Sequence, residues 1–457
     1  MALVRCDRPP ELCLVKRGAA MTRLLVSITA LLLATAILLT GNGLQSVLLP
    51  VRGDLAGFST VEIAALGSAY FAGILIGSLF VPFLVSSVGH VRTHSAMTAL
   101  LCAVTLAYAL LLHPWLWIAL RVFYGVFLAG IYLVVESWLN ERADNASRGS
   151  ILSIYTIINL VMMAAGQLLI NVYDPRGYEL FILSALLVSL AAVPVALTRQ
   201  ITPVQRPHGG FKLATLTGLP RVSVIGALAG GITTGAFWGL APVYAQAIGL
   251  GTGGVSLFLA ITITGGALFQ WPLGRLSDAI DRRRVIILCL VGAAVAGTFL
   301  RMGPATALIP TLAAVFAFGA FAFPLYPISA AHAIDWTDAD GIVDTGTGIL
   351  FLTGVGALTG PLLAATAIAF LDASALFLFT SLIHGLAAAA AVIMIATRAP
   401  IDDDEKVDFH LAPRTTPMAY ELSPYGDDEA EDGDEGVGQG DAADAPDGAI
   451  RDRHAAE

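Results

Sequence analysis

Long apolar stretches dominate this chain and decide what it can fold into. Only 13% of its residues are charged, whereas soluble domains carry about 25%, so most of the length has no polar surface to offer water. A membrane-spanning helix needs about 20 mostly apolar residues. Twelve runs of roughly that length occur, near residues 24–48, 63–85, 95–112, 115–139, 151–172, 178–198, 219–248, 255–279, 285–302, 305–331, 347–371 and 374–397. We predict an all-α protein with twelve transmembrane helices and the lipid bilayer as its solvent.

Basic residues predict how these helices are oriented. If the N-terminus is cytoplasmic, the cytoplasmic segments before the tail hold 15 Lys and Arg residues, and the outer loops hold three: Arg52, Arg176 and Arg301. Cytoplasmic loops of membrane proteins carry this excess, so both termini are predicted to be cytoplasmic. The predominance of Arg over Lys favours a bacterial source, which makes the inner membrane the expected location.

The polar stretch in the middle and the two ends divide the chain. The predicted parts are an N-terminal cytoplasmic segment (1–22), a six-helix bundle (23–198), a central cytoplasmic loop (199–217), a second six-helix bundle (218–398) and a cytoplasmic tail (399–457). Residues 1–20 are expected to be unstructured, and Met21 is an alternative start. The tail holds 18 acidic and 4 basic residues, a net charge of −14, and such compositions stay disordered and solvated. The body carries +5 without a basic stripe, which argues against nucleic-acid binding.

The two halves of the chain resemble each other at a nearly constant offset. Matches at an offset of 192 residues include Gly43 with Gly235 and Gly73 with Gly265, and matches at 194 residues include Gly125 with Gly319 and Gly166 with Gly360. This offset equals six helices and a linker, so both halves enter the membrane from the same side. Parallel repeats are typical of two-lobed transporters that rock about a site near the bilayer midplane. We therefore predict two pseudo-symmetric bundles.

A charged loop follows the eighth apolar run, at Gly274–Arg284. It resembles the Gly-x-Leu-Ala/Ser-Asp-Arg-x-Gly-Arg-Arg loop of the major facilitator superfamily. In that family the loop's Asp and Arg form contacts that hold one access state closed, and Asp278 and Arg282 match those positions. Asp281 stands where the family has Gly, which puts the tight turn of the loop in question. The resemblance assigns a gate role to Gly274, Asp278, Arg282 and Arg283.

The first half carries a degenerate copy of this loop at Pro82–Arg92. Ser86 replaces the Asp, while Gly89 and Arg92 remain. The resemblance implies that the gating contact differs between the halves.

The fourth run extends the resemblance. Arg121 and Gly125 match the family's Arg-x-x-x-Gly pattern, and Glu136–Arg142 followed by Arg148 is similar to the YcaD-like group of facilitator transporters. What the resemblance implies is a secondary transporter of a small organic solute that works by alternating access, with protons as a candidate coupling ion. The expected state is a monomer without cofactor or metal.

Arg121 and Glu136 are the two charges that we expect inside this span. A charge at the centre of a span costs about 2.5–3.5 kcal/mol on insertion scales, so Arg121 is expected to face the protein interior. It either binds an anionic group or tunes a proton site, or else it caps carbonyls or reaches the interface beside Trp115 and Trp117. For Glu136 the alternatives are a gate ion pair with an arginine (Arg92, Arg142 or Arg148), a proton-coupling carboxylate and an ordinary interfacial residue.

Helices 1, 4, 7 and 10 line the central cavity in this superfamily, and their polar and aromatic residues are candidates for substrate contact. They describe an apolar, aromatic cavity with one cation, which favours an amphipathic or anionic molecule over a sugar or a metal ion. The candidates are Asn42, Gln45, Arg121, Tyr124, Tyr132, Thr234, Trp238, Tyr244, Phe323 and Tyr326, joined by Gln270 and Trp271 from the eighth run.

Other classes of protein fit the sequence less well. A membrane enzyme needs a cluster of catalytic side chains inside the membrane, and no span supplies one. A channel needs a repeated polar stripe. A transporter-like sensor that signals through the acidic tail stays open as the alternative function. His384 is expected to be a packing residue, and His332 and Asp335 are assigned to the cytoplasmic gate.

Overall fold

The structure is a computed structural model that describes most of the chain. The described residues are 10–143, 148–197, 215–303, 307–338 and 341–395, with five residues of the tail at 406, 409, 415, 416 and 420; side chains are described from Ile28 onward. Residues 199–214 of the predicted central loop and the rest of the predicted tail lie outside the described residues, whereas the last three residues of that loop, 215–217, are described and helical.

Helices account for nearly all of the described chain, and twelve of its segments are long and apolar enough to cross a membrane. The first half contains α1 (Pro10–Leu55), α2 (Thr60–Val88), α3 (His90–Leu110), α4 (Pro114–Arg142), α5 (Arg148–Leu168), the 3₁₀ turn η1 (Leu169–Asn171) and α6 (Glu179–Leu197). The second half contains α7 (Thr215–Gly218), α8 (Arg221–Ala247), α9 (Thr252–Ala279), α10 (Arg282–Met302), α11 (Leu308–Ala322), α12 (Leu325–Ile334), α13 (Ile342–Phe370) and α14 (Ala375–Ile395). The predicted all-α, twelve-span fold is confirmed.

Two details of the helices differ from prediction. The first helix begins at Pro10, within the segment that we expected to be unstructured. The tenth span consists of two helices, α11 and α12, separated at Phe323 and Pro324. Pro324, which lacks the N–H that a continuous helix needs, lies at this break, although Pro242 and Pro361 lie inside helices that stay continuous.

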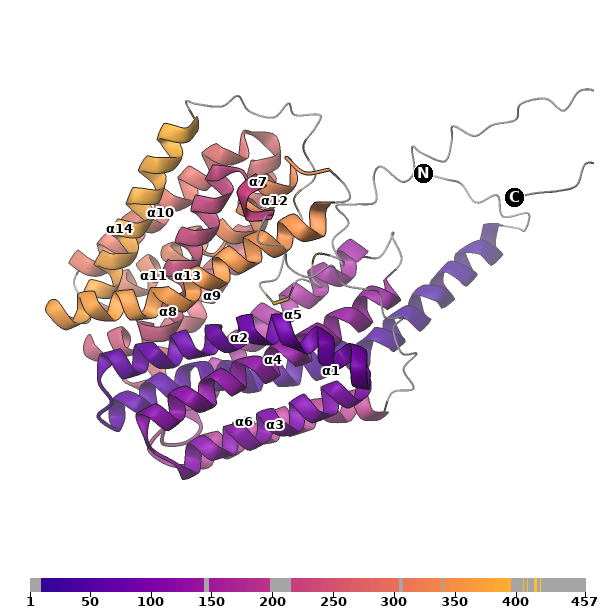
Figure 1. The fold of residues 1–457 in the computed structure, drawn as a ribbon, viewed down its shortest axis with the longest axis horizontal. Coiled ribbons are helices and arrows are strands. Elements are labelled where there is room, and N and C mark those ends of the chain that lie inside the picture. Colours follow the sequence, from indigo (N-terminus) through magenta and orange to yellow (C-terminus); the bar gives the residue numbers. More distant parts are fainter. Residues whose placement is uncertain are drawn as a thin grey trace, which may run out of the picture.

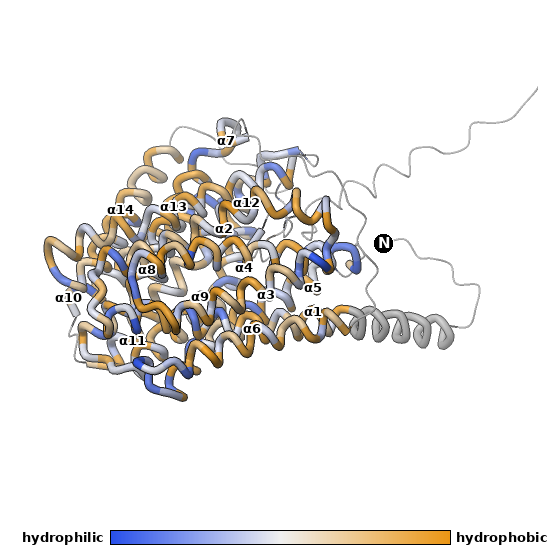
Figure 2. The backbone as a smooth tube through the Cα atoms, turned by 60° about the horizontal axis from the view of Figure 1, so that its bottom comes forward, coloured by the Kyte–Doolittle hydropathy of each residue, from blue (hydrophilic) through white to orange (hydrophobic). Residues whose placement is uncertain are grey.

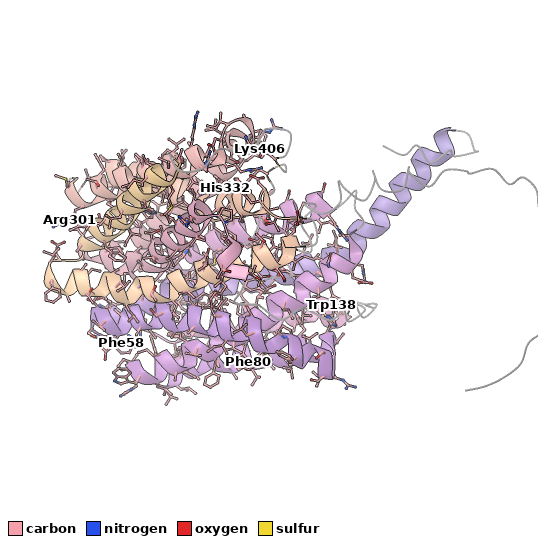
Figure 3. All side chains as sticks on the ribbon, turned by 45° about the horizontal axis from the view of Figure 1, so that its top comes forward. Phe58, Phe80, Trp138, Arg301, His332 and Lys406 are labelled. Carbon is pink, nitrogen blue, oxygen red and sulfur yellow. The ribbon has the colours of Figure 1, made fainter. Side chains whose placement is uncertain are left out.

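The helices form two bundles that lie side by side (Figure 1). Hydrophobic residues run along the helices and hydrophilic ones gather toward their ends (Figure 2). We call the face where the first span begins, at Ile28, and where α14 ends, at Ile395, the terminal face; the other is the opposite face. Phe58 and Arg301 lie toward the opposite face, whereas Trp138, His332 and Lys406 lie toward the terminal face (Figure 3).

Repeat glycines mark where equivalent helices cross in each bundle. In the first half, a Cβ on Gly43 would overlap the backbone of α5, and one on Gly73 would overlap the backbone of α4. In the second half, a Cβ on Gly235 would overlap α13 and one on Gly265 would overlap α11. Small residues permit such close backbone approach in membranes. The sequence repeat is therefore a repeat of helix-crossing points.

The two halves contact each other toward the opposite face. Asn171 at the end of the fifth span donates from Nδ2 to Ser256 Oγ near the start of α9, at 2.9 Å. About two turns inside that face, a Cβ on Gly67 of α2 would lie 3.0 Å from Gly239 Cα of α8 and 3.4 Å from the Pro361 ring of α13. These contacts hold the halves together at the opposite face in this conformation.

Candidate functional site

One face of α4 carries the predicted site residues of the first half. Arg121, Tyr124, Tyr132 and Glu136 are all buried, and intervals of three, eight and four residues place them on one side of a helix. At 1.5 Å per residue, Arg121 and Glu136 lie about 22 Å apart along the axis. The two charges of this span therefore belong to different levels of the membrane and form no ion pair with each other.

Arg121 lies in an aromatic setting near the opposite face. Its guanidinium carbon is 4.6 Å from the ring centroid of Tyr70 on α2 and 4.9 Å from that of Tyr124. The residue is 7% exposed, and its Nη1 has no hydrogen-bond partner among the described residues. Trp117, fully buried one helical turn earlier on α4, donates from Nε1 to Leu111 O at 2.7 Å. The arginine thus faces the protein interior, and its Nη1 finds no acceptor among the described residues.

Amide side chains on α1 and α5 lie in the same half of the protein as Arg121. Tyr124 donates its hydroxyl to Asn42 Oδ1 at 3.2 Å, which connects α1 to the arginine-bearing face of α4. Gln45 on α1 and Gln167 on α5 are both fully buried, and neither amide atom of either side chain has a partner in the described part of the chain. Buried amides normally find partners, so this half retains unused hydrogen-bonding capacity. Sequence reasoning missed Gln167 and Tyr70.

The second half supplies aromatic rings. The Trp238 and Phe323 rings lie 5.9 Å apart, and Thr234 and Gln270 are buried. Tyr326 on α12 shares a 2.7 Å hydrogen bond between hydroxyls with Tyr420 of the tail. This half therefore presents aromatic and hydroxyl groups but no buried charge near its middle among the described residues.

Two candidates of the second half lie elsewhere. Trp271 is 57% exposed, and its ring carries the Arg275 guanidinium at 4.4 Å, so it faces outward, against our expectation. Tyr244 donates to Leu300 O at 3.0 Å and packs on Phe377, which is a packing role. Periodicity alone could not assign these faces, because the apolar residues of α8 and α9 surround the helix on all sides.

Glu136 is fully buried near the terminal end of α4. Its carboxylate accepts a hydrogen bond from Tyr155 of α5 at 2.8 Å and another from the hydroxyl of Thr416 in the tail. These are hydroxyl partners rather than the predicted arginines. Arg142 ends α4, almost two turns beyond Glu136, and Arg148 begins α5, so both start from the helix ends while the carboxylate lies inside the bundle.

The charged loop between α9 and α10 forms a buried network. Arg282, 1% exposed, pairs with Asp278 at 3.1 Å and with Asp335 beyond α12 at 2.8 Å. It also donates to Ser277 Oγ at 3.2 Å. Arg283 pairs with Asp281 at 2.7 Å. Partial burial raises the pKa of Asp281, but the hydrogen bonds and charge of Arg283 outweigh it and hold that pKa below its usual value.

The turn of this loop is built without glycine. Asp281 adopts φ −54° and caps α10, accepting from Arg283 N at 3.0 Å. At the equivalent place in the first half, Gly89 adopts φ +88°, a conformation that suits glycine. Asp281 thus replaces a glycine turn with a side-chain cap. Arg92 of the first copy is exposed, so the two loops differ as the missing Asp at Ser86 suggests.

His384 contacts Thr233 across the bundle, with 3.0 Å between Nε2 and Oγ1, and lies in the packed interior between α14 and α8. In the described chain, no three His, Cys, Asp or Glu side chains group as a metal site would require.

Comparison with known proteins matches this architecture to a family. The family model described as Major Facilitator Superfamily matches residues 31–220 and 223–416, which cover both bundles and reach the tail. The chain belongs to the Major Facilitator Superfamily. It is therefore a transporter-type membrane protein rather than an enzyme, and the resemblance seen in the sequence is confirmed.

Relatives within the superfamily include the uncharacterized MFS-type transporter YcaD of Escherichia coli O9:H4, which is 28% identical over 334 residues, covering 72% of this chain and 86% of that protein. YcaD of Salmonella arizonae is 27% identical over 344 residues, covering 74% and 86%. The nucleoside transporter NupG superposes with a TM-score of 0.69 at 12% identity, covering 80% of this chain and 99% of NupG. A bacterial homolog of the lysosomal transporter Spinster, in an inward-facing and occupied conformation, gives 0.66 at 15%, covering 83% and 97%. At these identities the structures share the fold alone.

Proposed function

We propose that this superfamily member is a secondary active transporter of a small amphipathic organic anion, which it moves by alternating access between its two halves. The observation that carries the proposal is Arg121. It is a buried cation inside the membrane, stacked on Tyr70 and Tyr124, with an unpartnered Nη1 among the described residues. Intramembrane charges are costly and mark substrate or ion pathways, and a guanidinium suits a carboxylate or a phosphate.

The surroundings of Arg121 support an amphipathic rather than a purely polar solute. Aromatic rings of both halves, together with the buried amides of Asn42, Gln45 and Gln167, offer apolar area and a few hydrogen bonds. Such a mixture of apolar walls and few polar groups is the usual make-up of small-molecule sites.

Orientation and coupling complete the proposal. The excess of Lys and Arg supports a cytoplasmic terminal face in a bacterial inner membrane, and the contact between Asn171 and Ser256 at the opposite face supports an inward-facing conformation. Glu136 is the group that we propose as proton carrier, because it is a fully buried carboxylate within a span. Two halves in one chain provide both sides of the pathway, so a monomer is sufficient.

A thermal-shift screen of the purified protein tests the substrate class. Ligands that bind only the folded state stabilise it by about 2.7 kcal/mol at 100 times Kd. Organic carboxylates and phosphates should raise the apparent Tm of the wild type but not that of Arg121→Ala. The matched control is Arg301→Ala, which removes an arginine of the second half that pairs with exposed Asp372 at 3.3 Å. Stabilisation by neutral or cationic solutes alone, unchanged in Arg121→Ala, would contradict the proposal.

A further inference from the structure

Part of the acidic tail packs against the membrane bundle. Of its five described residues, Thr416 is fully buried, Tyr420 is 3% exposed and Thr415 is 8% exposed. We call Lys406, Phe409, Thr415, Thr416 and Tyr420 together the tail strap. Its burial departs from the prediction that the whole tail is solvated, which averaged the composition over 59 residues and so passed over these few aromatic and hydroxyl side chains.

The tail strap holds the first half through Glu136. The Thr416 hydroxyl donates to the Glu136 carboxylate, which also accepts from Tyr155. Both Thr416 and Glu136 are fully buried. Hydrogen bonds to a carboxylate are stronger than neutral ones, so this is a specific anchor inside the first bundle.

The same strap holds the second half through its aromatic residues. Tyr420 bonds the Tyr326 hydroxyl at 2.7 Å and joins the apolar cluster formed by α8, α12 and α13. Phe409 packs against the cluster that includes Leu273, and its backbone N–H donates to Asp278 Oδ1 at 3.1 Å. Lys406 donates to Ile280 O at 3.2 Å. The strap therefore reaches the charged loop as well as α12.

Two glycines leave room for these rings. A Cβ on Gly274, the first residue of the charged loop, would overlap the Phe409 ring, and one on Gly346 of α13 would lie 2.5 Å from Tyr420 Cγ. Real Cβ atoms essentially never come so close. At positions 274 and 346, therefore, only glycine is compatible with the docked strap.

We propose that the tail strap is an autoinhibitory element that ties the two halves together at the terminal face and must release before the protein can change its access state. The proposal rests on the alternating-access function proposed above. Rocking moves the terminal ends of the halves relative to each other, and the strap grips Glu136 on one half and Tyr326 with Gly346 on the other. Its release frees that movement.

A disulfide tests the docking without any substrate. Tyr420 Cβ is one bond, about 1.5 Å, from Cγ. The Cβ atoms of Gly346→Cys and Tyr420→Cys are therefore at most about 4 Å apart, a separation that a disulfide accepts. With the native cysteines replaced, oxidation should cross-link this pair in the full chain, as peptide mapping by mass spectrometry would show. The control pair is Gly385→Cys with Tyr420→Cys, since Gly385 is exposed on α14. Equal cross-linking of both pairs, or of neither, would overturn the docking.

A thiol at the opposite face tests the regulation. Ser256→Cys is a minimal change at the contact with Asn171, and its maleimide labelling reports separation of the halves there. In the full chain, Phe409→Ala with Tyr420→Ala should raise this labelling rate about fivefold or more, within the usual range of coupling between sites. Labelling of Gly251→Cys, exposed in the same face, should not change. Oxidation of the Gly346→Cys and Tyr420→Cys pair should slow Ser256→Cys labelling, and a reductant should restore it.

The outcomes separate the strap from the transport function. A cross-link that forms while Ser256→Cys labelling stays the same in all states would overturn the autoinhibition. It would leave the proposed transport function standing, because that function is tested by Arg121-dependent solute binding.

Discussion

Glu136, buried near the terminal end of α4, accepts a hydrogen bond from Thr416, 280 positions further along the chain. This contact joins the membrane span that carries the superfamily's Arg-x-x-x-Gly pattern to a tail that composition alone assigns to solvent. The proposed proton carrier, Glu136, is thus also the residue that the proposed regulatory tail strap binds.

Removing the Thr416 hydroxyl should loosen this contact. In Thr416→Val the buried Glu136 keeps Tyr155 but loses one donor, and a buried group left unsatisfied costs about 1–3 kcal/mol. We expect a lower apparent Tm and faster trypsin cleavage after Lys406. Thr366→Val is the matched control, because Thr366 is exposed on α13 and bonds only its own helix at Leu363 O. Equal behaviour of the two variants would argue against an anchoring role for Thr416.

The proposed proton coupling is tested by removing the charge of Glu136. Glu136→Gln keeps the shape and one acceptor oxygen for Tyr155 or Thr416, offers an NH2 to the other hydroxyl, and cannot carry a proton. Transport of an identified solute should follow an imposed pH gradient in the wild type and ignore it in Glu136→Gln. A response to the gradient that survives in the variant would rule out Glu136 as the proton carrier.

The buried ion pair between Arg282 and Asp335 should be costly to break from one side. The side chains are 1% and 2% exposed, so Arg282→Ala leaves a buried carboxylate without this partner, at a cost of about 3–5 kcal/mol. The apparent Tm should fall accordingly. Arg92→Ala, which removes the exposed arginine of the first-half loop, should change it little.

Replacing both members of this ion pair distinguishes the loss of the pair from the cost of leaving one buried charge alone. Arg282→Met with Asp335→Leu removes both charges, and buried pairs replaced by apolar residues are often neutral or stabilising. Its apparent Tm should exceed that of Arg282→Ala. A double variant less stable than either single one would show that the two residues act mainly through other partners.

The glycine crossings predict a sharp contrast between two similar substitutions. Gly73→Ala places a Cβ against the backbone of α4 at Val122 and Gly125, and overpacking of this kind costs about 1–3 kcal/mol. Gly385→Ala meets no atom within 4 Å and should leave the apparent Tm unchanged or slightly raised. Comparable losses in both variants would contradict the crossing-point interpretation of the repeat.

Sequence reasoning reached the fold because membrane spans are local features. Each needs only length and apolar composition, so twelve runs predicted twelve spans, although the tenth was placed three residues early at both ends, at 305–331 instead of Leu308–Ile334. The helical start at Pro10 was missed because residues 10–23 are too polar to be counted as a span.

The candidate site was predicted less completely, because its contacts join distant segments. The cost of burying a charge predicted that Arg121 faces inward, but its partner Tyr70 comes from α2 through packing at Gly73 and Gly125. Nothing local connects Glu136 to Tyr155 or to the tail. Trp271 was predicted to line the cavity together with Gln270, but its side chain faces outward.

Alternating access can be measured directly with two pairs of spin labels. The background would lack the native cysteines and carry Phe409→Ala with Tyr420→Ala, so that the strap does not hold the halves. Arg92→Cys with Arg284→Cys spans the halves at the terminal face, and Arg176→Cys with Gly251→Cys spans them at the opposite face; all four positions are exposed. Distances would be measured by pulsed electron paramagnetic resonance, with and without the organic anions that stabilise the wild type but not Arg121→Ala. We predict that the anions shorten the terminal-face distance and lengthen the opposite-face distance together. Two distances that stay fixed at saturating anion, or that change in the same direction, would contradict the account.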